Sequence, residues 1–531
     1  MIELVIEPAL AGDRDWPARR REGSVAMLIK SQPDEIQDFL SDASYLQGGH
    51  ASRVVVPESA EEVSEILAEA TRNLTPVTIS GAGTGTVAGR VPFGGVVLAT
   101  DKLNRVRQIV HDDHGRGHAI AEAGVILGDF QRAVESEGLL YPPDPTERSC
   151  FLGGTVATNA SGARTFKYGP TRNYVERLTI ALATGDVIDL HRGKLPADAN
   201  GKITIPLPSR RFIEAQLPTY QMPQVRKHAS GYYIAPGMDA IDLFIGSEGT
   251  LGVILEIEVK LLPKPEGLLS GVVFFITEAE LLAFVREARG RSLANRAPRT
   301  TAREGSALDA RALEYFDVES LRFLRQKYDA VPAEAIGAIF FEQETTASTE
   351  ESLMSEWLGL VESNHALADD SWFATNEPDQ AGLREFRHAL PVLMNEWFAR
   401  HKQKKVSTDM AVPDEAFAGM LRFYQDSLRG GSLRYTIFGH IGDNHVHVNI
   451  LPRDDDEAAR AREIYQMFIR RAVEVGGTVS AEHGIGKLKR EYLRHLYGDE
   501  HLREMAELKR AFDPLGILGR GNMFADQYLQ M

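Results

Sequence analysis

Runs of β-branched residues alternate with amphipathic segments along the first half of the chain. Arg53–Pro57 predicts a strand, and Ser59–Thr71 predicts a helix that has Ser59 as its N-cap and a glutamate three residues later. Residues 33–46 predict a shorter helix before this unit. Further strands are expected at residues 94–100 and 118–127, followed by a helix at 127–137.

The second half of the chain has longer helical periods between short apolar runs. Strands are predicted at Ala338–Glu342 and Tyr435–Phe438, and helices at Glu350–Ser363, Leu383–His401, Asp414–Leu428, Glu457–Val475 and Leu502–Phe512. This pattern favours an antiparallel sheet covered by helices, and therefore an α+β fold. The predicted domains are an N-terminal arm and helix (1–47), a β-rich domain (48–265, with a polar insertion at about 191–240) and a C-terminal domain (266–531).

Three glycine-rich blocks fall within the β-rich domain. The first, at Pro76–Gly89, follows a short strand, and its small residues let consecutive backbone N–H groups form an anion-binding nest. It is not a Rossmann loop, because Thr86 occupies the third glycine position and Pro92 would break the following helix. The other blocks, Gly153–Gly169 and Phe244–Ile254, predict close backbone approach to a large phosphate-bearing ligand.

Composition narrows the class of protein. The 531 residues carry a formal net charge of −16, which argues against nucleic-acid binding and against adhesion to an anionic membrane. No apolar run approaches the roughly 20 residues of a membrane span, and the N-terminus lacks a signal-peptide pattern. The single cysteine excludes an intrachain disulfide and a cysteine-ligated cluster. We expect a cytoplasmic protein.

Histidines gather in one short segment of the C-terminal domain. His440, His445 and His447 fall within Phe438–Asn449, and strand alternation would place His445 and His447 on one face. Imidazoles together with a carboxylate suit Zn²⁺ or a similar divalent ion. The sequence therefore predicts a metal site of His440, His447 and Glu482, with a position open for substrate oxygens.

The neighbouring residues supply candidates for the remaining roles at this site. His483, next to Glu482, is the candidate general base. A cation for a substrate carboxylate is expected from Arg387 or from Lys402–Lys405, although the lysines fit a solvated helix end equally well.

Three motifs occur in a characteristic order: GSEGTLG at 246–252, FGHIGD at 438–443 and SAEHGIGK at 480–487. Together they resemble the FAD-linked D-2-hydroxy-acid dehydrogenases of the vanillyl-alcohol-oxidase flavoprotein superfamily. That family includes D-lactate dehydrogenases, the glycolate oxidase flavin subunit and D-2-hydroxyglutarate dehydrogenase. The resemblance extends over roughly residues 35–525.

The resemblance implies a two-subdomain PCMH-type FAD-binding domain followed by an α/β cap domain. It implies that the cap supplies the metal ligands and the base, and that Asn449 contacts the substrate. It also implies an FAD site formed by Ser80, Gly81, Ala82, Gly83, Thr84, Gly85, Pro143, Thr146, Gly153, Gly154, Asn159, Gly162, Gly246, Glu248, Gly249, Gly252, Val253, Ile254 and Asn522.

The chain departs from the family pattern at several positions. Ser80 and Ala82 replace members of an Arg-Gly-Gly-Gly loop, and Ser407 stands where a cationic residue is usual. Asn444 and His445 replace Gly-Asn, a departure that would add a ligand or change specificity. The first glycine block contains no histidine, the nearest being His50, so we expect non-covalent FAD.

These features predict FAD-dependent oxidation of a D-2-hydroxy acid (D-lactate, glycolate or a D-2-hydroxyglutarate-like acid) to the 2-oxo acid. A divalent metal, Zn²⁺ or Mn²⁺, would acidify the hydroxyl, His483 would take its proton, and hydride would pass to flavin N5. A quinone, an electron-transfer flavoprotein, a cytochrome or O₂ would take the electrons. The alternatives are a non-redox flavin transferase of the alkylglycerone-phosphate synthase type and a non-catalytic flavin- or metal-binding protein. Peripheral attachment to the inner membrane and a homodimer are left open.

Overall fold

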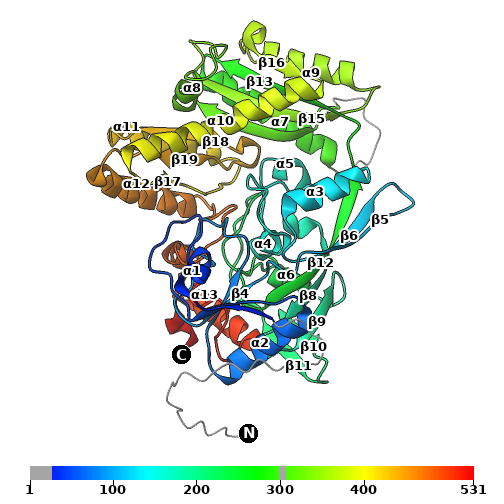
Figure 1. The fold of residues 1–531 in the computed structure, drawn as a ribbon. Helices are drawn as coiled ribbons and strands as arrows, with labels where there is room; N and C mark the ends of the chain where they lie inside the picture. Colours follow the sequence, from blue (N-terminus) through cyan, green and yellow to red (C-terminus); the bar gives the residue numbers. More distant parts are fainter. Residues whose placement is uncertain (1–26, 298–306, 531) are drawn as a thin grey trace.

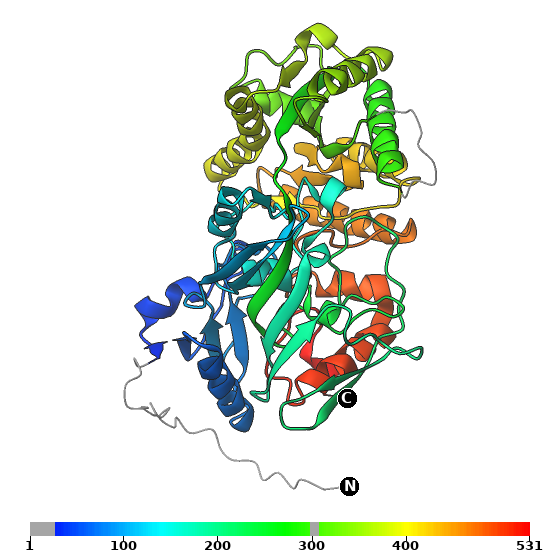
Figure 2. The same cartoon turned by 90° about the vertical axis from the view of Figure 1, so that its right-hand side faces the viewer.

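The computed structural model describes residues 27–297 and 307–530. The first 26 residues of the predicted N-terminal arm lie outside this part of the chain. The chain runs from the blue elements in the lower half of Figure 1, through the cyan elements near the middle, to the yellow-green elements at the top. It then returns, so that the red helix α13 (Arg490–Phe512) lies in the lower half of the molecule in both views (Figures 1 and 2).

The first sheet contains the predicted strand–helix unit. Helix α2 (Ala60–Arg72) begins where predicted, because the Ser59 hydroxyl accepts a hydrogen bond from the Glu62 N–H. Its apolar face, which includes Val63 and Leu67, packs against the sheet. The sheet order is β1-β2-β4-β3, formed by β1 (Leu28–Lys30), β2 (Arg53–Val56), β3 (Val77–Ser80) and β4 (Val96–Ala99).

The helix predicted at residues 33–46 is shorter than expected. Helix α1 (Pro33–Ile36) continues only as a 3₁₀ turn at Gln37–Phe39. The Asp42 carboxylate then accepts a hydrogen bond from the Ser44 N–H, a local turn that competes with helix.

The second sheet joins distant parts of the predicted β-rich domain. Its order is β5-β6-β12-β8-β9, with β7 paired to the end of β12. Its strands are β5 (Val106–His111), β6 (Gly117–Glu122), β7 (Leu139–Leu140), β8 (Val175–Ala181), β9 (Val187–His191) and β12 (Val253–Pro263). The associated helices are α3 (Leu127–Ser136), α4 (Leu152–Ala157), α5 (Thr165–Tyr168) and α6 (Ile241–Phe244), with a 3₁₀ turn at Thr171–Asn173. The predicted insertion contributes a hairpin of β10 (Lys202–Pro206) and β11 (Phe212–Gln216).

The third sheet is antiparallel at every pairing of its described strands and is covered by helices, as predicted. The helices lie on both of its faces. Its order is β16-β13-β15-β14-β18-β19-β17. Alternation along β13 sends Val273 and Phe275 into the core with α7 and α9, and Val272 and Phe274 into the core with α8 and α10.

The bounds of these elements are as follows. The strands are β13 (Gly267–Phe275), β14 (Ala310–Asp317), β15 (Gly337–Thr345), β16 (Trp372–Ala374), β17 (Val406–Ser407), β18 (Tyr435–Gly439) and β19 (His447–Ile450). The helices are α7 (Glu278–Arg296), α8 (Val318–Leu324), α9 (Glu350–Ser363), α10 (Glu377–His401), α11 (Phe417–Gly430) and α12 (Asp455–Glu474). Further 3₁₀ turns lie at Ala368–Asp370, Ile441–Asp443 and Asp526–Leu529.

The C-terminal segment returns to the first sheet. The Gly519 N–H donates to the Val77 carbonyl, and the Val77 N–H donates to the Ile517 carbonyl.

None of the helices within residues 27–297 and 307–530 is long and apolar enough to cross a membrane.

Candidate functional site: a glycine-lined cavity and a histidine–carboxylate cluster

The three glycine-rich blocks converge on one cavity of about 390 Å³, a volume within the range of about 300–1,000 Å³ typical of ligand sites. A Cβ added at Gly85 or Gly154 would meet no atom of the described part of the chain within 4 Å, so open space lies beside the backbone there. The predicted residues on its wall are Gly81, Ala82, Gly83, Thr84, Gly85, Thr146, Gly153, Gly154, Glu248, Gly249, Gly252 and Ile254. Backbone N–H groups and small side chains therefore dominate these positions, which fits a dinucleotide.

Other predicted cofactor residues do not line this cavity. Among the residues described, they are Ser80, Pro143, Asn159, Gly162, Gly246, Val253 and Asn522. Two of them make hydrogen bonds near the lining: Asn159 accepts from the Arg172 N–H, and the Asn522 amide donates to the Gly89 and Glu248 carbonyls.

Arg90 holds the first glycine block and was not found from the sequence. Its guanidinium donates to the carbonyls of Asp38, Ser41 and Gly81 and to the Ser80 hydroxyl. Gly83 has a φ of 81°, and a Cβ there would also clash with the Arg90 guanidinium, so both the backbone and this side chain favour glycine. The arginine lies ten residues beyond Ser80, outside the glycine pattern that identified the block.

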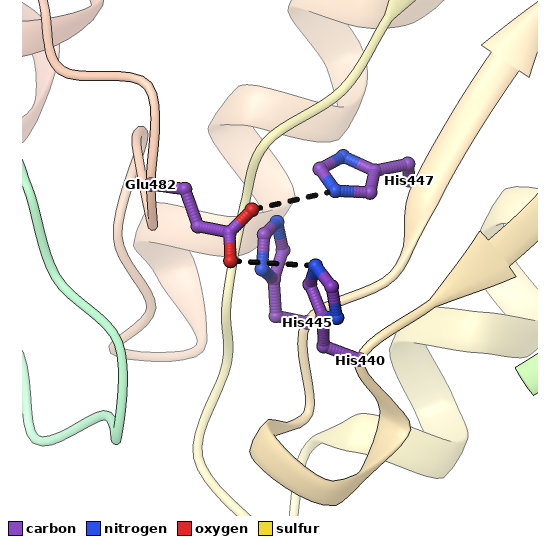
Figure 3. Close-up of side chains that lie close together, drawn as sticks. All are labelled: His440, His445, His447 and Glu482. Carbon is purple, nitrogen blue, oxygen red and sulfur yellow. Dashed lines mark ion pairs between the residues drawn. The ribbon is translucent and has the colours of Figure 1, made fainter. Parts of the chain in front are cut away.

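The three predicted metal ligands lie together in the cap (Figure 3). His440 Nε2 lies 3.3 Å from Glu482 Oε1, and His447 Nε2 lies 3.6 Å from Glu482 Oε2. His440 directly follows β18, His447 is the first residue of β19, and Glu482 comes from a loop between α12 and α13. With His445, these side chains each offer one ligand atom, and the four atoms lie within 4.8 Å of one another.

His445 is not on the strand that the alternation predicted. A 3₁₀ turn at Ile441–Asp443 and the left-handed Asn444 (φ 54°) precede it, and β19 begins only at His447. The turn, not strand alternation, therefore brings the His445 ring to 4.5 Å from that of His447, measured between centroids.

A buried carboxylate and a guanidinium lie behind His440. Glu314 Oε1 is 2.6 Å from His440 Nδ1, and Glu314 Oε2 accepts from Arg387 Nη2 at 2.9 Å. Burial alone would lower the pKa of His440, but the Glu314 and Glu482 carboxylates raise it to about 9. Arg387, predicted to meet a substrate carboxylate, is thus already paired with Glu314.

Lys227 is the most important residue that the sequence did not reveal. Its ammonium is completely buried, lies 2.6 Å from Glu482 Oε1 and donates to the Gly162 carbonyl at 2.7 Å. It also lies 3.5 Å from the buried carboxylate of Asp443. Burial would raise the pKa of Glu482, but His440 and Lys227 hold it well below its usual value.

The candidate base His483 is held by Asp409. This buried carboxylate accepts the His483 N–H at 3.0 Å, lies 3.3 Å from His483 Nδ1 and pairs with Lys489 at 2.6 Å. Burial lowers the pKa of His483 to about 4, although Asp409 opposes this shift.

His483 and Glu482 also line the glycine-lined cavity, so the cluster and the cavity share a wall. The Glu248 carboxylate strengthens this junction, because it accepts from the backbone N–H groups of Ile485 and Gly486.

The other polar positions predicted at the site are Asn449 and the lysines of Lys402–Lys405. Asn449 is buried on β19, and its amide lies within hydrogen-bonding distance of the His447 carbonyl at 3.3 Å. The lysines of Lys402–Lys405 follow α10 at the surface, where Lys404 donates to the Tyr45 carbonyl.

Comparison with known proteins agrees with this architecture. Residues 51–191 match the FAD binding domain family, and residues 292–523 match the C-terminal domain of FAD linked oxidases. Glycolate oxidase subunit GlcD of Bacillus subtilis is 31% identical over 89% of this chain and 88% of its own. A D-lactate dehydrogenase of Anaerostipes hadrus is 30% identical over 92% and 93%, respectively. A D-2-hydroxyglutarate dehydrogenase of Stutzerimonas stutzeri is 26% identical over 89% and 91%.

One solved structure, an alkyldihydroxyacetonephosphate synthase, shares the fold with a TM-score of 0.65 at 14% identity, covering 92% of this chain and 82% of its own. Together with the cavity formed by the glycine blocks, these matches define a flavoprotein oxidoreductase with a PCMH-type FAD-binding domain. The chain belongs to the FAD-linked oxidases, in the group of enzymes that act on 2-hydroxy acids. The predicted family and fold class are confirmed.

Proposed function

We propose that this enzyme oxidises a D-2-hydroxy acid to the 2-oxo acid with assistance from a divalent metal ion. One observation carries the proposal: Glu482 of the histidine–carboxylate cluster and His483 both line the glycine-lined cavity. We propose that FAD binds in this cavity, which is called the flavin cavity below. A substrate bound between cluster and cavity would have metal ligands, a base and the cofactor within reach of one carbon atom.

The residues suit both groups that this reaction requires. FAD, held non-covalently by the glycine blocks, supplies the acceptor for a hydride. Zn²⁺ or Mn²⁺, held by His440, His447 and Glu482, supplies a Lewis acid for the substrate hydroxyl. Two imidazoles and a carboxylate are a common donor set for such ions.

In this proposal His483 takes the hydroxyl proton. Asp409 orients the ring and would stabilise its protonated form, as a carboxylate partner does for a catalytic histidine. Asn449 and Arg387 are the proposed contacts for the substrate carboxylate. Because Arg387 also pairs with Glu314, it additionally holds the Glu314–His440 pair in place.

The electron acceptor and the location are proposed on the sequence alone. A quinone, an electron-transfer flavoprotein, a cytochrome or O₂ would reoxidise the cofactor, in the cytoplasm or at the inner membrane surface.

The first experiment is anaerobic bleaching of the yellow protein with a panel of D- and L-2-hydroxy acids, before and after treatment with EDTA. We expect one D-acid to bleach the flavin, with loss of bleaching on chelation and recovery with Zn²⁺ or Mn²⁺. Bleaching that survives complete metal removal would contradict metal assistance. A yellow protein that no hydroxy acid bleaches would instead favour the non-redox transferase.

Substitution of the proposed base tests its role in flavin reduction separately from the binding of FAD. His483→Asn should retain bound FAD, yet reduce it on the order of 10²–10⁴-fold more slowly, the usual contribution of a general base. Flavin reduction at the native rate would exclude His483 as the base.

A further inference from the structure

His445 belongs to the cluster without having a role in the proposed reaction. Its side chain is completely buried, and its ring lies 4.5 Å from that of His447 and 5.3 Å from that of His440, measured between centroids. One nitrogen of its ring lies within 4.8 Å of the ligand atoms of His440, His447 and Glu482 (Figure 3).

Within residues 27–297 and 307–530, neither ring nitrogen of His445 completes a hydrogen bond. Asp409 Oδ1 is 3.2 Å from His445 Nε2 without completing a hydrogen bond, and Asp409 already accepts from Glu482, His483, Ser480 and Lys489. A buried polar group left without a partner costs about 1–3 kcal/mol. The buried side chain of His445 therefore requires an interaction that compensates for this cost.

A buried histidine with a purely structural role looks different in the same molecule. His228 is also enclosed, but its Nδ1 lies 2.8 Å from the Thr478 hydroxyl and its Nε2 lies 3.3 Å from the Tyr497 hydroxyl. Both nitrogens of His228 are thus satisfied by the protein, whereas His445 completes no hydrogen bond with the described residues and places one ring nitrogen among the ligand atoms of the cluster.

We propose that His445 is a further ligand of the ion held by His440, His447 and Glu482. This inference rests on the metal site of the proposed function and extends it to three imidazoles and one carboxylate. Four protein ligands would fill a tetrahedral coordination sphere. An ion that also binds a substrate oxygen must therefore accept five or six ligands at this site.

The test measures the number of ligands on the metal ion and does not depend on enzyme activity. FAD-loaded enzyme is stripped of metal and titrated with Zn²⁺ or Mn²⁺ alone, and X-ray absorption then measures the number of coordinated imidazoles. We expect three imidazoles in the native protein and two in His445→Asn. We also expect the dissociation constant of the variant to rise by about 100-fold or more, beyond the 10–100-fold typical of residues that only support a ligand.

Two further variants control for damage to the loop. Asn444→Gly loses polar contacts to Arg289 and Asp414 in the same loop, its φ of 54° suits glycine, and it should keep all three imidazoles. His445→Ala should regain an imidazole ligand when free imidazole is added. Retained flavin absorbance in each variant shows that the fold persists.

The outcomes separate this inference from the proposed function. A native protein that binds the ion through only two imidazoles, with His445→Asn unchanged in affinity, overturns the role of His445 but leaves metal assistance standing. A native protein that binds neither ion overturns metal assistance and the role of His445 together, whereas hydroxy-acid oxidation is judged separately by flavin bleaching.

Discussion

The flavin cavity and the histidine–carboxylate cluster share a wall but are built by opposite means. The cavity is shaped largely by backbone and small residues from three segments that are each continuous in sequence. The cluster consists of ionisable side chains, and each buried charge is balanced by a residue far away in the chain. The first site depends on space beside the backbone, and the second depends on charge balance.

The two sites should therefore respond differently to substitution. A larger side chain in the cavity is expected to weaken ligand binding there without affecting the ion pairs of the cluster. Removal of one charge is expected to harm the cluster more severely, because the remaining partner is left buried without compensation.

The largest effect is expected from Lys227→Met. The variant leaves Glu482 and Asp443 without their buried cation, which should lower the free energy of unfolding by about 3–5 kcal/mol. Urea denaturation of metal-free protein measures this loss. Stability within 1 kcal/mol of the native protein would show that the cluster does not depend on Lys227.

The next largest effect, on ion binding, is expected from Glu314→Gln. The substitution keeps the shape but removes the charge that pairs with Arg387 and His440, so the affinity for Zn²⁺ or Mn²⁺ should fall about 10–100-fold. Titration of metal-free, FAD-loaded protein tests this. Flavin content should stay unchanged, and a parallel loss of flavin would mean that the two sites are not separable.

At the cavity, Gly154→Val should weaken FAD binding by about tenfold or more, since valine would occupy space that the ligand needs. Equilibrium dialysis of the apoprotein with FAD gives the affinity. The ion affinity is expected to stay native. Gly153→Ala is the contrasting variant: its Cβ would lie 2.6 Å from Ala123 Cβ, so it should destabilise the fold itself.

The smallest effect is expected from Arg226→Met, the neighbour of Lys227 in sequence. Arg226 pairs with Asp414, whose side chain is half exposed, and such pairs contribute about 0–1 kcal/mol. The same urea measurement that detects the loss in Lys227→Met should show almost no change. A loss as large as that of Lys227→Met would remove the contrast between buried and exposed pairs in this segment.

Much of the fold could be predicted from the sequence because it is encoded locally. Helix α9 has the predicted bounds, and α2 begins beside its predicted cap. The glycine blocks were identified as backbone that approaches a ligand, and they do surround one cavity. The prediction was wrong at residues 33–46, where a side-chain turn competes with helix, and at His445, where a 3₁₀ turn replaces the expected strand.

The strand–helix order, the glycine blocks and the residue types of the candidate metal site can be identified from the amino-acid sequence. The balance of their charges becomes visible only in the folded chain, where Lys227 contacts Glu482 across 255 positions and Glu314 contacts His440 across 126. This difference follows from the range of each interaction. Hydrophobic periodicity and backbone freedom act over a few residues, whereas a buried charge needs a partner within about 4 Å, wherever in the chain that partner lies.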